Sequence, residues 1–206
     1  MEILISIDGV IRNKIQKFDY HYKDCYFNSD TEEENPFEYG VSDKIYNDSL
    51  FNYYKFQSNE EYEFFTFIEY PIEIFGHAGL SYPHVFNELH NLIRLNPEHN
   101  FTIIGLDEFG KAKPATLFFL SKNGFVGNNI KFIKTDEIEN TWDMYDTWIT
   151  DNEKIISKCP TTKNVIKFNT IYNDYFNYNK EINKLNELTE TWSNFMENTT
   201  SLILKE

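Results

Sequence analysis

The chain has 206 residues, of which 41% are hydrophobic, so it is long enough to bury a core as one domain with an insertion or as two small domains. Its 19 lysines and arginines face 33 aspartates and glutamates, and the formal charge of −14 argues against binding to nucleic acid or to an anionic membrane surface. No apolar run approaches the roughly 20 residues of a transmembrane helix, and the acidic, early-interrupted N-terminus is unlike a signal peptide. We therefore expect a protein that is made in the cytoplasm and has no membrane or nucleic-acid partner.

Strands and helices are predicted to alternate along the chain. Short apolar runs that end at turn residues predict five strands, at residues 2–7, 100–105, 130–133, 147–150 and 164–168. Helical periodicity and capping residues predict helices between them, at residues 82–95, about 114–122, 142–145 and 152–158. This alternation is typical of an α/β fold, and we expect a three-layer, Rossmann-like core with a mainly parallel five-stranded sheet covered on both faces.

Two segments stand apart from this alternation. Residues 14–80 are rich in Tyr, Phe, Asp and Asn and predict a cap-like insertion, so that the core would comprise residues 1–13 and 81–206. A C-terminal helix is expected over about 179–204, because apolar residues recur there at spacings of three and four: Ile182, Leu185, Leu188, Trp192, Phe195, Thr199 and Leu202. Two alternatives stay open for this stripe, packing against the parent domain or docking on another subunit.

Small or polar residues lie at the ends of three predicted strands: Ser6, Asp8, Gly105, Thr150 and Asp151. In parallel α/β sheets, ligands bind beyond the carboxyl ends of the strands. We therefore expect these five residues to meet at one edge of the sheet and to form a pocket there.

The stretch ISIDGV at the first strand end and the later WDMYDTWITDN carry a family resemblance. Together with the order of elements, they resemble the haloacid dehalogenase-like (HAD-like) superfamily, especially its small 5′-nucleotidase-like members, over most of the chain. The segments EYPIEIFGHAG, ATLFFLSKNG and WDMYDTWITDN are also similar to HAD-like proteins encoded among the virion genes of crAss-like bacteriophages. The resemblance implies the HAD-like fold.

The resemblance also implies a mechanism that this sequence does not support. In active members a carboxylate attacks phosphorus, a second carboxylate two residues later protonates the leaving group, and Mg²⁺ neutralises the phosphoryl charge. Ser6 stands at the position of the attacking carboxylate, while Asp8 keeps the acid/base position. A serine hydroxyl is neutral at physiological pH and needs a base that the sequence does not display nearby.

The other three motifs of the superfamily are altered as well. Gly105 stands where a phosphate-binding Thr or Ser is usual, and Thr150-Asp151 replaces a pair of acids. No lysine lies near Asn140, where the third motif is expected, and Lys134 is at best a displaced substitute. We therefore expect a pseudoenzyme without catalytic residues, cofactor or metal, in which the five strand-end residues are the remnant of a pocket.

A dissenting hypothesis is a Mg²⁺-dependent phosphohydrolase of the 5′-nucleotidase-like type. Asp8 and Asp151 are weak candidates to bind the cation through oxygen ligands, with Asp146 as a third. A further alternative is a sensor that binds a phosphate ligand without turnover.

The favoured hypothesis is a non-catalytic HAD-like structural and protein-interaction component of a bacteriophage particle, in the tail or head-to-tail region. Its partners would be other virion proteins or further copies of the same chain, and its location would be the virion. Both the loss of the four motifs and the phage resemblance point to this role.

Overall fold

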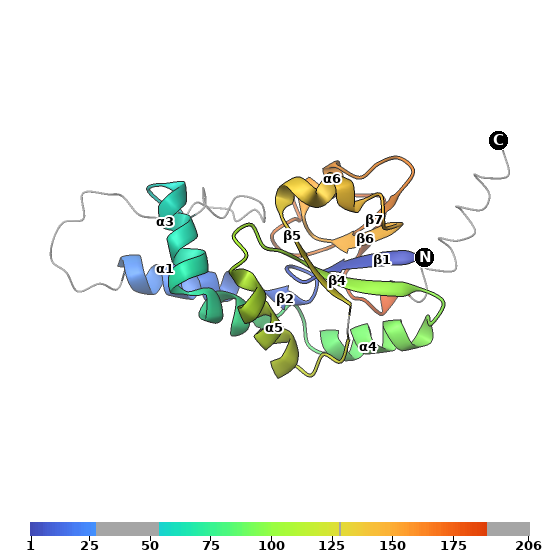
Figure 1. The fold of residues 1–206 in the computed structure, drawn as a ribbon, viewed down its shortest axis with the longest axis horizontal. Coiled ribbons are helices and arrows are strands. Elements are labelled where there is room, and N and C mark those ends of the chain that lie inside the picture. Colours follow the sequence, from blue (N-terminus) through green and yellow to red (C-terminus); the bar gives the residue numbers. More distant parts are fainter. Residues whose placement is uncertain (28–53, 128, 189–206) are drawn as a thin grey trace.

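The computed structural model describes residues 1–27, 54–127 and 129–188, and its centre is a six-stranded sheet (Figure 1). The strand order is β5-β4-β1-β6-β7-β8, and every neighbouring pair is parallel. The strands are β1 (Glu2–Ser6), β4 (Asn100–Leu106), β5 (Ile130–Ile133), β6 (Thr147–Thr150), β7 (Asn164–Phe168) and β8 (Glu181–Ile182). The predicted parallel α/β fold is confirmed, with one strand more than the five expected.

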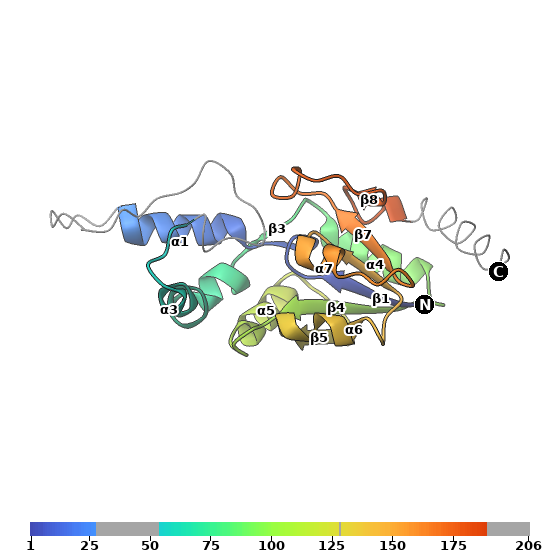
Figure 2. The same ribbon diagram turned by 90° about the horizontal axis from the view of Figure 1, so that it is seen from above.

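Helices cover both faces of the sheet. On one face lie α4 (Val85–Leu95) and α5 (Ala112–Lys122), and on the other lie α6 (Ile138–Thr141) and α7 (Glu153–Ser157) (Figures 1 and 2). Side chains of β1 alternate between these faces, because successive residues of a strand point to opposite sides. Ile3 and Ile5 pack with α4 and α5, whereas Leu4 packs with α6 and α7. The three layers therefore follow from the alternation within each strand.

One predicted helical turn is misplaced. It was expected over residues 142–145, but the chain turns earlier, in the 3-10 segment η3 (Thr135–Glu137) and in α6. The Glu137 carboxylate accepts a hydrogen bond from the backbone N–H of Lys134 at 2.8 Å, which favours a helical start at this point. Helix α6 consequently ends at Thr141, and residues 142–144 follow it as hydrogen-bonded turns.

The start of the predicted C-terminal helix is wrong. Residues 181 and 182 form β8, in which Ile182 pairs with Phe168 at the edge of the sheet. The backbone N–H of Asn169 donates to the Ile182 carbonyl at 2.8 Å, so the edge of β7 satisfies backbone groups here. The apolar stripe nevertheless predicts burial correctly in the described part, because its first three members lie in the main core: Ile182, Leu185 and Leu188. The predicted helix beyond residue 188 lies outside the described residues.

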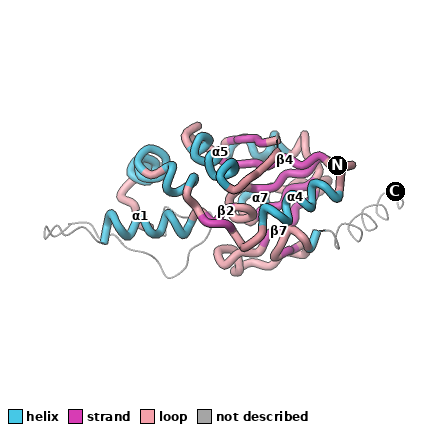
Figure 3. The backbone as a smooth tube through the Cα atoms, turned by 90° about the horizontal axis from the view of Figure 1, so that it is seen from below, coloured by secondary structure: helices cyan, strands magenta, loops and turns pink. Residues whose placement is uncertain are grey.

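The described parts of the predicted insertion gather beyond the carboxyl ends of the strands, at the end of the molecule opposite to residue 1 (Figures 1 and 3). They contain α1 (Ile15–Phe27), α3 (Asn59–Glu63) and two short π-helical segments, η1 (Phe64–Glu69) and η2 (Ile72–Gly76). An antiparallel pair of short strands, β2 (Arg12–Asn13) and β3 (Gly79–Leu80), joins the two ends of the segment.

Aromatic side chains build a second core in this region, around Phe18, Tyr22, Tyr54, Phe56 and Phe65. The same cluster reaches α5 through Ala112 and Ala115. The division at residues 14–80 into a separate cap-like unit stays a prediction. No helix within the described ranges is both long enough and apolar enough to pass through a lipid bilayer.

Candidate functional site

A pocket of about 490 Å³ opens at the carboxyl ends of β1, β6 and β7. Asp8 follows β1 by two residues, and Asp151 comes directly after β6; both line the pocket. Phe168 at the end of β7 and Tyr82 from the segment before α4 add aromatic walls. Of the five residues predicted to form a pocket, these two aspartates therefore lie in one.

The carboxylate of Asp8 is held by two cations. The Arg12 guanidinium contacts Asp8 Oδ1 through Nε and Nη2, each at 2.7 Å, and Lys14 Nζ lies 3.1 Å from Asp8 Oδ2. Arg12 is itself fixed, because its Nη1 donates to the Phe75 carbonyl at 3.0 Å and to Thr116 Oγ1 at 2.9 Å. Both oxygens of Asp8 are therefore engaged by side chains of the protein.

This environment makes Asp8 a poor general acid. Burial alone would raise the pKa of Asp8, but the positive charges of Arg12 and Lys14 outweigh burial and lower the pKa to about 2. A general acid works best with a pKa near the operating pH. At neutral pH Asp8 carries no proton to donate to a leaving group.

Asp151 has the opposite electrostatic character. Its residue is 2% exposed, and burial is the main reason why its pKa is raised to about 8. The negative charge of Asp8 adds to this increase of the pKa, while Lys14 acts against it. Asp151 is therefore mainly a neutral carboxylic acid at pH 7.

Gly9 allows Asp151 to reach this position. Its φ angle of +79° lies in the left-handed region, which residues other than glycine rarely adopt. A Cβ atom at Gly9 would lie 1.9 Å from the Asp151 carboxyl group. The turn after β1 consequently needs glycine both for its backbone conformation and for the close approach of Asp151.

Ser6 and Thr150 do not line the pocket, although both lie at strand ends. The Ser6 hydroxyl donates to Thr150 Oγ1 at 2.9 Å and accepts a hydrogen bond from Trp148 Nε1 at 3.0 Å. Ser6 is 8% exposed and Thr150 is fully buried. The hydroxyl at the position of the attacking group is thus part of a hydrogen-bonded cluster in the core.

Gly105 is likewise part of the packed interior. It lies in β4, and a Cβ atom built on it would be 3.2 Å from the ring of Phe132 and 3.4 Å from Ile7. Glycine therefore leaves room for an aromatic ring where a hydroxyl group is usual in the superfamily. Gly105 does not line the pocket.

The two remaining candidates lie elsewhere. Lys134 is exposed and precedes η3, outside the pocket lining. Asp146 lies at the amino end of β6, the end opposite to Asp151, where its carboxylate accepts from the Glu2 backbone N–H at 2.9 Å. The suggestion that Asp146 joins Asp8 and Asp151 at a cation is therefore wrong.

Sequence reasoning missed three residues at this edge of the sheet. Arg12 and Lys14 follow the Asp-Gly turn by only a few residues, and this pair of basic residues was a usable signal. Asp107 directly follows β4 and accepts hydrogen bonds from three backbone N–H groups at 3.0–3.1 Å, those of Lys111, Ala112 and Lys113. A carboxylate of the chain itself thus occupies the positive N-terminus of α5.

Among solved structures, one described as a haloacid dehalogenase-like hydrolase from Burkholderia xenovorans matches 95% of this chain and 97% of its own, with a TM-score of 0.52 and 11% sequence identity. The chain has a HAD-like fold. No family model matches the sequence, and no curated protein matches it either.

The HAD-like fold implies Mg²⁺, but the residues of the pocket do not fit this ion. Both oxygens of Asp8 are engaged by cations, and Asp151 is protonated near neutral pH, whereas Mg²⁺ binds ionised oxygen ligands. Within residues 1–27, 54–127 and 129–188, no three His, Cys, Asp or Glu side chains gather into a group that could hold a metal ion. We derive no chemical step through Mg²⁺.

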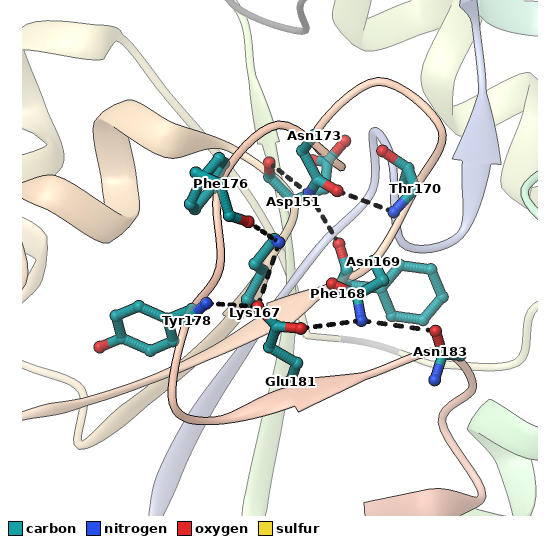
Figure 4. A network of polar contacts seen from close by, with 10 residues as sticks. All are labelled: Asp151, Lys167, Phe168, Asn169, Thr170, Asn173, Phe176, Tyr178, Glu181 and Asn183. Atoms are coloured by element: carbon teal, nitrogen blue, oxygen red, sulfur yellow. Dashed lines mark hydrogen bonds and ion pairs between the residues drawn. The ribbon is translucent and has the colours of Figure 1, made fainter.

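The loop after β7 forms one wall of the pocket and is held by buried side chains (Figure 4). The Asn173 side chain donates to the Asp151 carbonyl at 3.1 Å and to the Phe168 carbonyl at 2.9 Å. Its Oδ1 accepts from the Thr170 backbone N–H at 2.9 Å. Asn173 therefore connects the wall of the pocket to the ends of β6 and β7.

Lys167 anchors the far side of the same loop. Its ammonium group lies 3.2 Å from Glu181 Oε1, donates to the Phe176 carbonyl and lies 4.3 Å from the centre of the Phe176 ring (Figure 4). Lys167 is only 2% exposed, so its charge depends on these partners. The loop is thus held at both of its ends.

Proposed function

We propose that this chain is a non-catalytic HAD-like protein, which serves as a structural and protein-interaction component of a bacteriophage particle, in the tail or head-to-tail region. The observation that carries the non-catalytic part is the state of Asp8. A group with the acid/base role needs a free, protonated oxygen, but both oxygens of Asp8 contact cations and its pKa is about 2.

The position of the attacking carboxylate supports the same conclusion. Ser6 lies outside the pocket, and its hydroxyl donates to Thr150 rather than to a base. Removing one member of a catalytic unit commonly lowers the rate by several powers of ten. Here both the nucleophile and the acid are compromised, so little catalysis by the family mechanism is expected.

The virion part of the proposal rests on the sequence resemblance to HAD-like proteins of crAss-like phages. A fold does not fix a function, and a HAD-like domain without its chemistry can act as a rigid building block. Its partners would be other virion proteins or copies of itself, after synthesis in the host cytoplasm.

The location in the particle is tested by mass spectrometry of purified virions. We expect peptides of this chain at a fixed ratio to the major capsid protein in independent preparations, after nuclease and protease treatment of the particle surface. Absence from clean particles would remove the virion role while leaving the non-catalytic proposal untouched.

The rival function is a Mg²⁺-dependent phosphohydrolase, because Asp8 and Asp151 do line one pocket. It is tested with a panel of nucleotides and small phosphate esters in the presence of Mg²⁺, with wild-type protein and the Asp8→Asn variant side by side. We expect both proteins to release phosphate at the rate of the buffer. Turnover by the wild type that disappears in Asp8→Asn would instead favour the hydrolase.

A further inference from the structure

Lys14 contributes a positive charge to the pocket. It follows β2, lines the pocket and lies 3.1 Å from Asp8 Oδ2. Asp8 and Asp151 line the same pocket, and the positive charge of Lys14 lowers the pKa of both. Lys14 thus contacts one of these two acids and shares the pocket with the other.

We propose that the Lys14 ammonium, together with the Arg12 guanidinium, is a built-in counter-ion that takes the place of a divalent cation and keeps Mg²⁺ out of this pocket. This inference rests on the proposed non-catalytic function, and it names the residues that make the pocket independent of metal.

Arg12 and Lys14 contact Asp8 in different ways. Arg12 is 1% exposed and is fixed by Phe75 and Thr116, and its guanidinium also lies 5.1 Å from the Phe75 ring and 5.5 Å from the Phe119 ring. It cannot leave Asp8 without breaking contacts in the core. Arg12 therefore neutralises Asp8 permanently and holds the turn in place.

Lys14 contacts the second oxygen of Asp8, Oδ2. Its side chain is 24% exposed, so solvent reaches the place where the ammonium group lies. A divalent cation would have to displace this ammonium group from Asp8 Oδ2 and then remain close to a like charge, which is unfavourable in a partly buried site. Lys14 therefore excludes the metal ion from this oxygen.

Removal of the Lys14 charge should uncover a weak cation site. Asp8 Oδ2 would lose its ammonium partner, and Asp151 and Asp174 line the same pocket. Carboxylate oxygens are the ligands that hard divalent cations prefer, so the uncovered site would depend on Asp8 and would bind weakly. Lys14→Met keeps the length and apolar character of the side chain while removing the charge.

The test measures Mn²⁺ binding, because the electron paramagnetic resonance signal of free Mn²⁺ reports binding without any enzymatic assay. Lys17→Met is the matched control, since it removes the same charge from α1 at a residue outside the pocket lining. We expect no detectable Mn²⁺ binding in the wild type and in Lys17→Met. In Lys14→Met we expect one weakly bound ion, with an affinity at least about tenfold above the upper limit measured for the wild type. Adding Asp8→Asn to Lys14→Met should abolish this binding.

Two results would overturn the proposal: Mn²⁺ binding by the wild type at this pocket, or a folded Lys14→Met protein that binds no better than the wild type. Circular dichroism checks folding, and Lys14→Gln replaces Lys14→Met if the latter does not fold. Failure of the proposed function looks different. A wild type that hydrolyses phosphate esters in EDTA and binds no Mn²⁺ would contradict the absence of catalysis while leaving the role of Lys14 intact.

Discussion

Asp8 and Asp151 line the same pocket, yet their pKa values move in opposite directions. Asp8 is in direct contact with two cations, which outweigh the effect of its burial, so its pKa falls to about 2. Burial dominates for Asp151, and the charge of Asp8 adds to it, so the pKa rises to about 8. Two identical side chains thus differ because the charges of Arg12 and Lys14 outweigh burial at Asp8, whereas burial outweighs the charge of Lys14 at Asp151.

Asp151 should make the stability of the protein fall with rising pH. In the folded protein Asp151 keeps its proton up to about pH 8, whereas in the unfolded chain it loses the proton near its ordinary value of 3.8. Between these values the folded state binds more protons, so stability decreases as pH rises, by up to about 1.4 kcal/mol per pH unit.

Asp151→Asn removes this dependence, and the variant should gain stability relative to the wild type from pH 5 to pH 8. Urea unfolding at each pH measures the difference, with exposed Asp143→Asn as the control. A difference between Asp151→Asn and the wild type that stays constant over this range would contradict the protonated state of Asp151.

Gly9 and Gly110 offer a matched pair, because both have positive φ angles, +79° and +68°. A Cβ atom at Gly110 would meet nothing within 4 Å, whereas one at Gly9 would collide with Asp151. Gly110→Ala should cost about 1 kcal/mol of unfolding free energy through backbone strain alone. Gly9→Ala should cost about 3 kcal/mol or more, because the steric clash adds to the strain. Equal losses in urea unfolding would show that Asp151 does not pack against Gly9.

The sequence predicts residue positions along the chain better than residue roles. Asp8 and Asp151 were expected at a pocket because turn and acidic residues follow apolar strands. Ser6 was assigned to the pocket by the same argument, but it lies two residues after Leu4 and therefore shares its face of the sheet. The contact of Arg12 with Thr116 spans 104 residues, and no local pattern reveals a contact of this range.

At the scale of elements, the loop between β7 and β8 depends on a buried ion pair. Lys167 is almost completely buried, and Glu181 in β8 provides its carboxylate partner at 3.2 Å. The same carboxylate accepts hydrogen bonds from the Tyr178 backbone N–H and from the Asn169 side chain. Glu181 therefore connects the edge strand to both ends of the loop that walls the pocket.

Glu181→Ala should lower the free energy of unfolding more than Lys167→Met does. Glu181→Ala leaves the buried Lys167 ammonium without its carboxylate, and we expect a loss of about 2 kcal/mol. Lys167→Met removes the buried charge and keeps an apolar side chain beside Phe176, so its loss should be smaller. Hydrogen exchange should show faster exchange of residues 169–180 in Glu181→Ala than in Lys167→Met. The reverse order would mean that the ion pair does not hold the loop.

Elements with a strong local signal were predicted well. The five apolar strands follow from their apolar runs, and α4 follows from its helical periodicity. Helix α7 follows from its cap Asn152, whose side chain accepts from the N–H groups of Lys154 and Ile155. Helix α5 was expected from Pro114 and the Asn123-Gly124 stop, but Leu117 and Phe118, which were expected to face inward, are exposed. Strands β2, β3 and β8 have only two residues each, and such short strands form because a neighbouring strand supplies hydrogen bonds. Their existence depends on tertiary structure, which the local sequence does not contain.

At the scale of the whole molecule, the chain combines a HAD-like fold with a pocket whose charges are already compensated. The fold match extends over nearly the full length of both proteins at 11% identity, so two very different sequences have a similar architecture. Apolar side chains maintain the architecture, whereas the chemistry would depend on a few charged groups at one edge of the sheet. A fold of this kind can therefore be kept while the charged groups at that edge change.

The most direct test of the proposed absence of phosphoryl chemistry is a crystal structure of the wild-type protein soaked with Mg²⁺ and a small phosphate ester. We predict that Asp8 keeps its contacts with Arg12 and Lys14, that Ser6 keeps its hydrogen bond to Thr150, and that no side chain is phosphorylated. An octahedral ion between Asp8 and Asp151, or a phosphorylated side chain at the end of β1, would contradict this account.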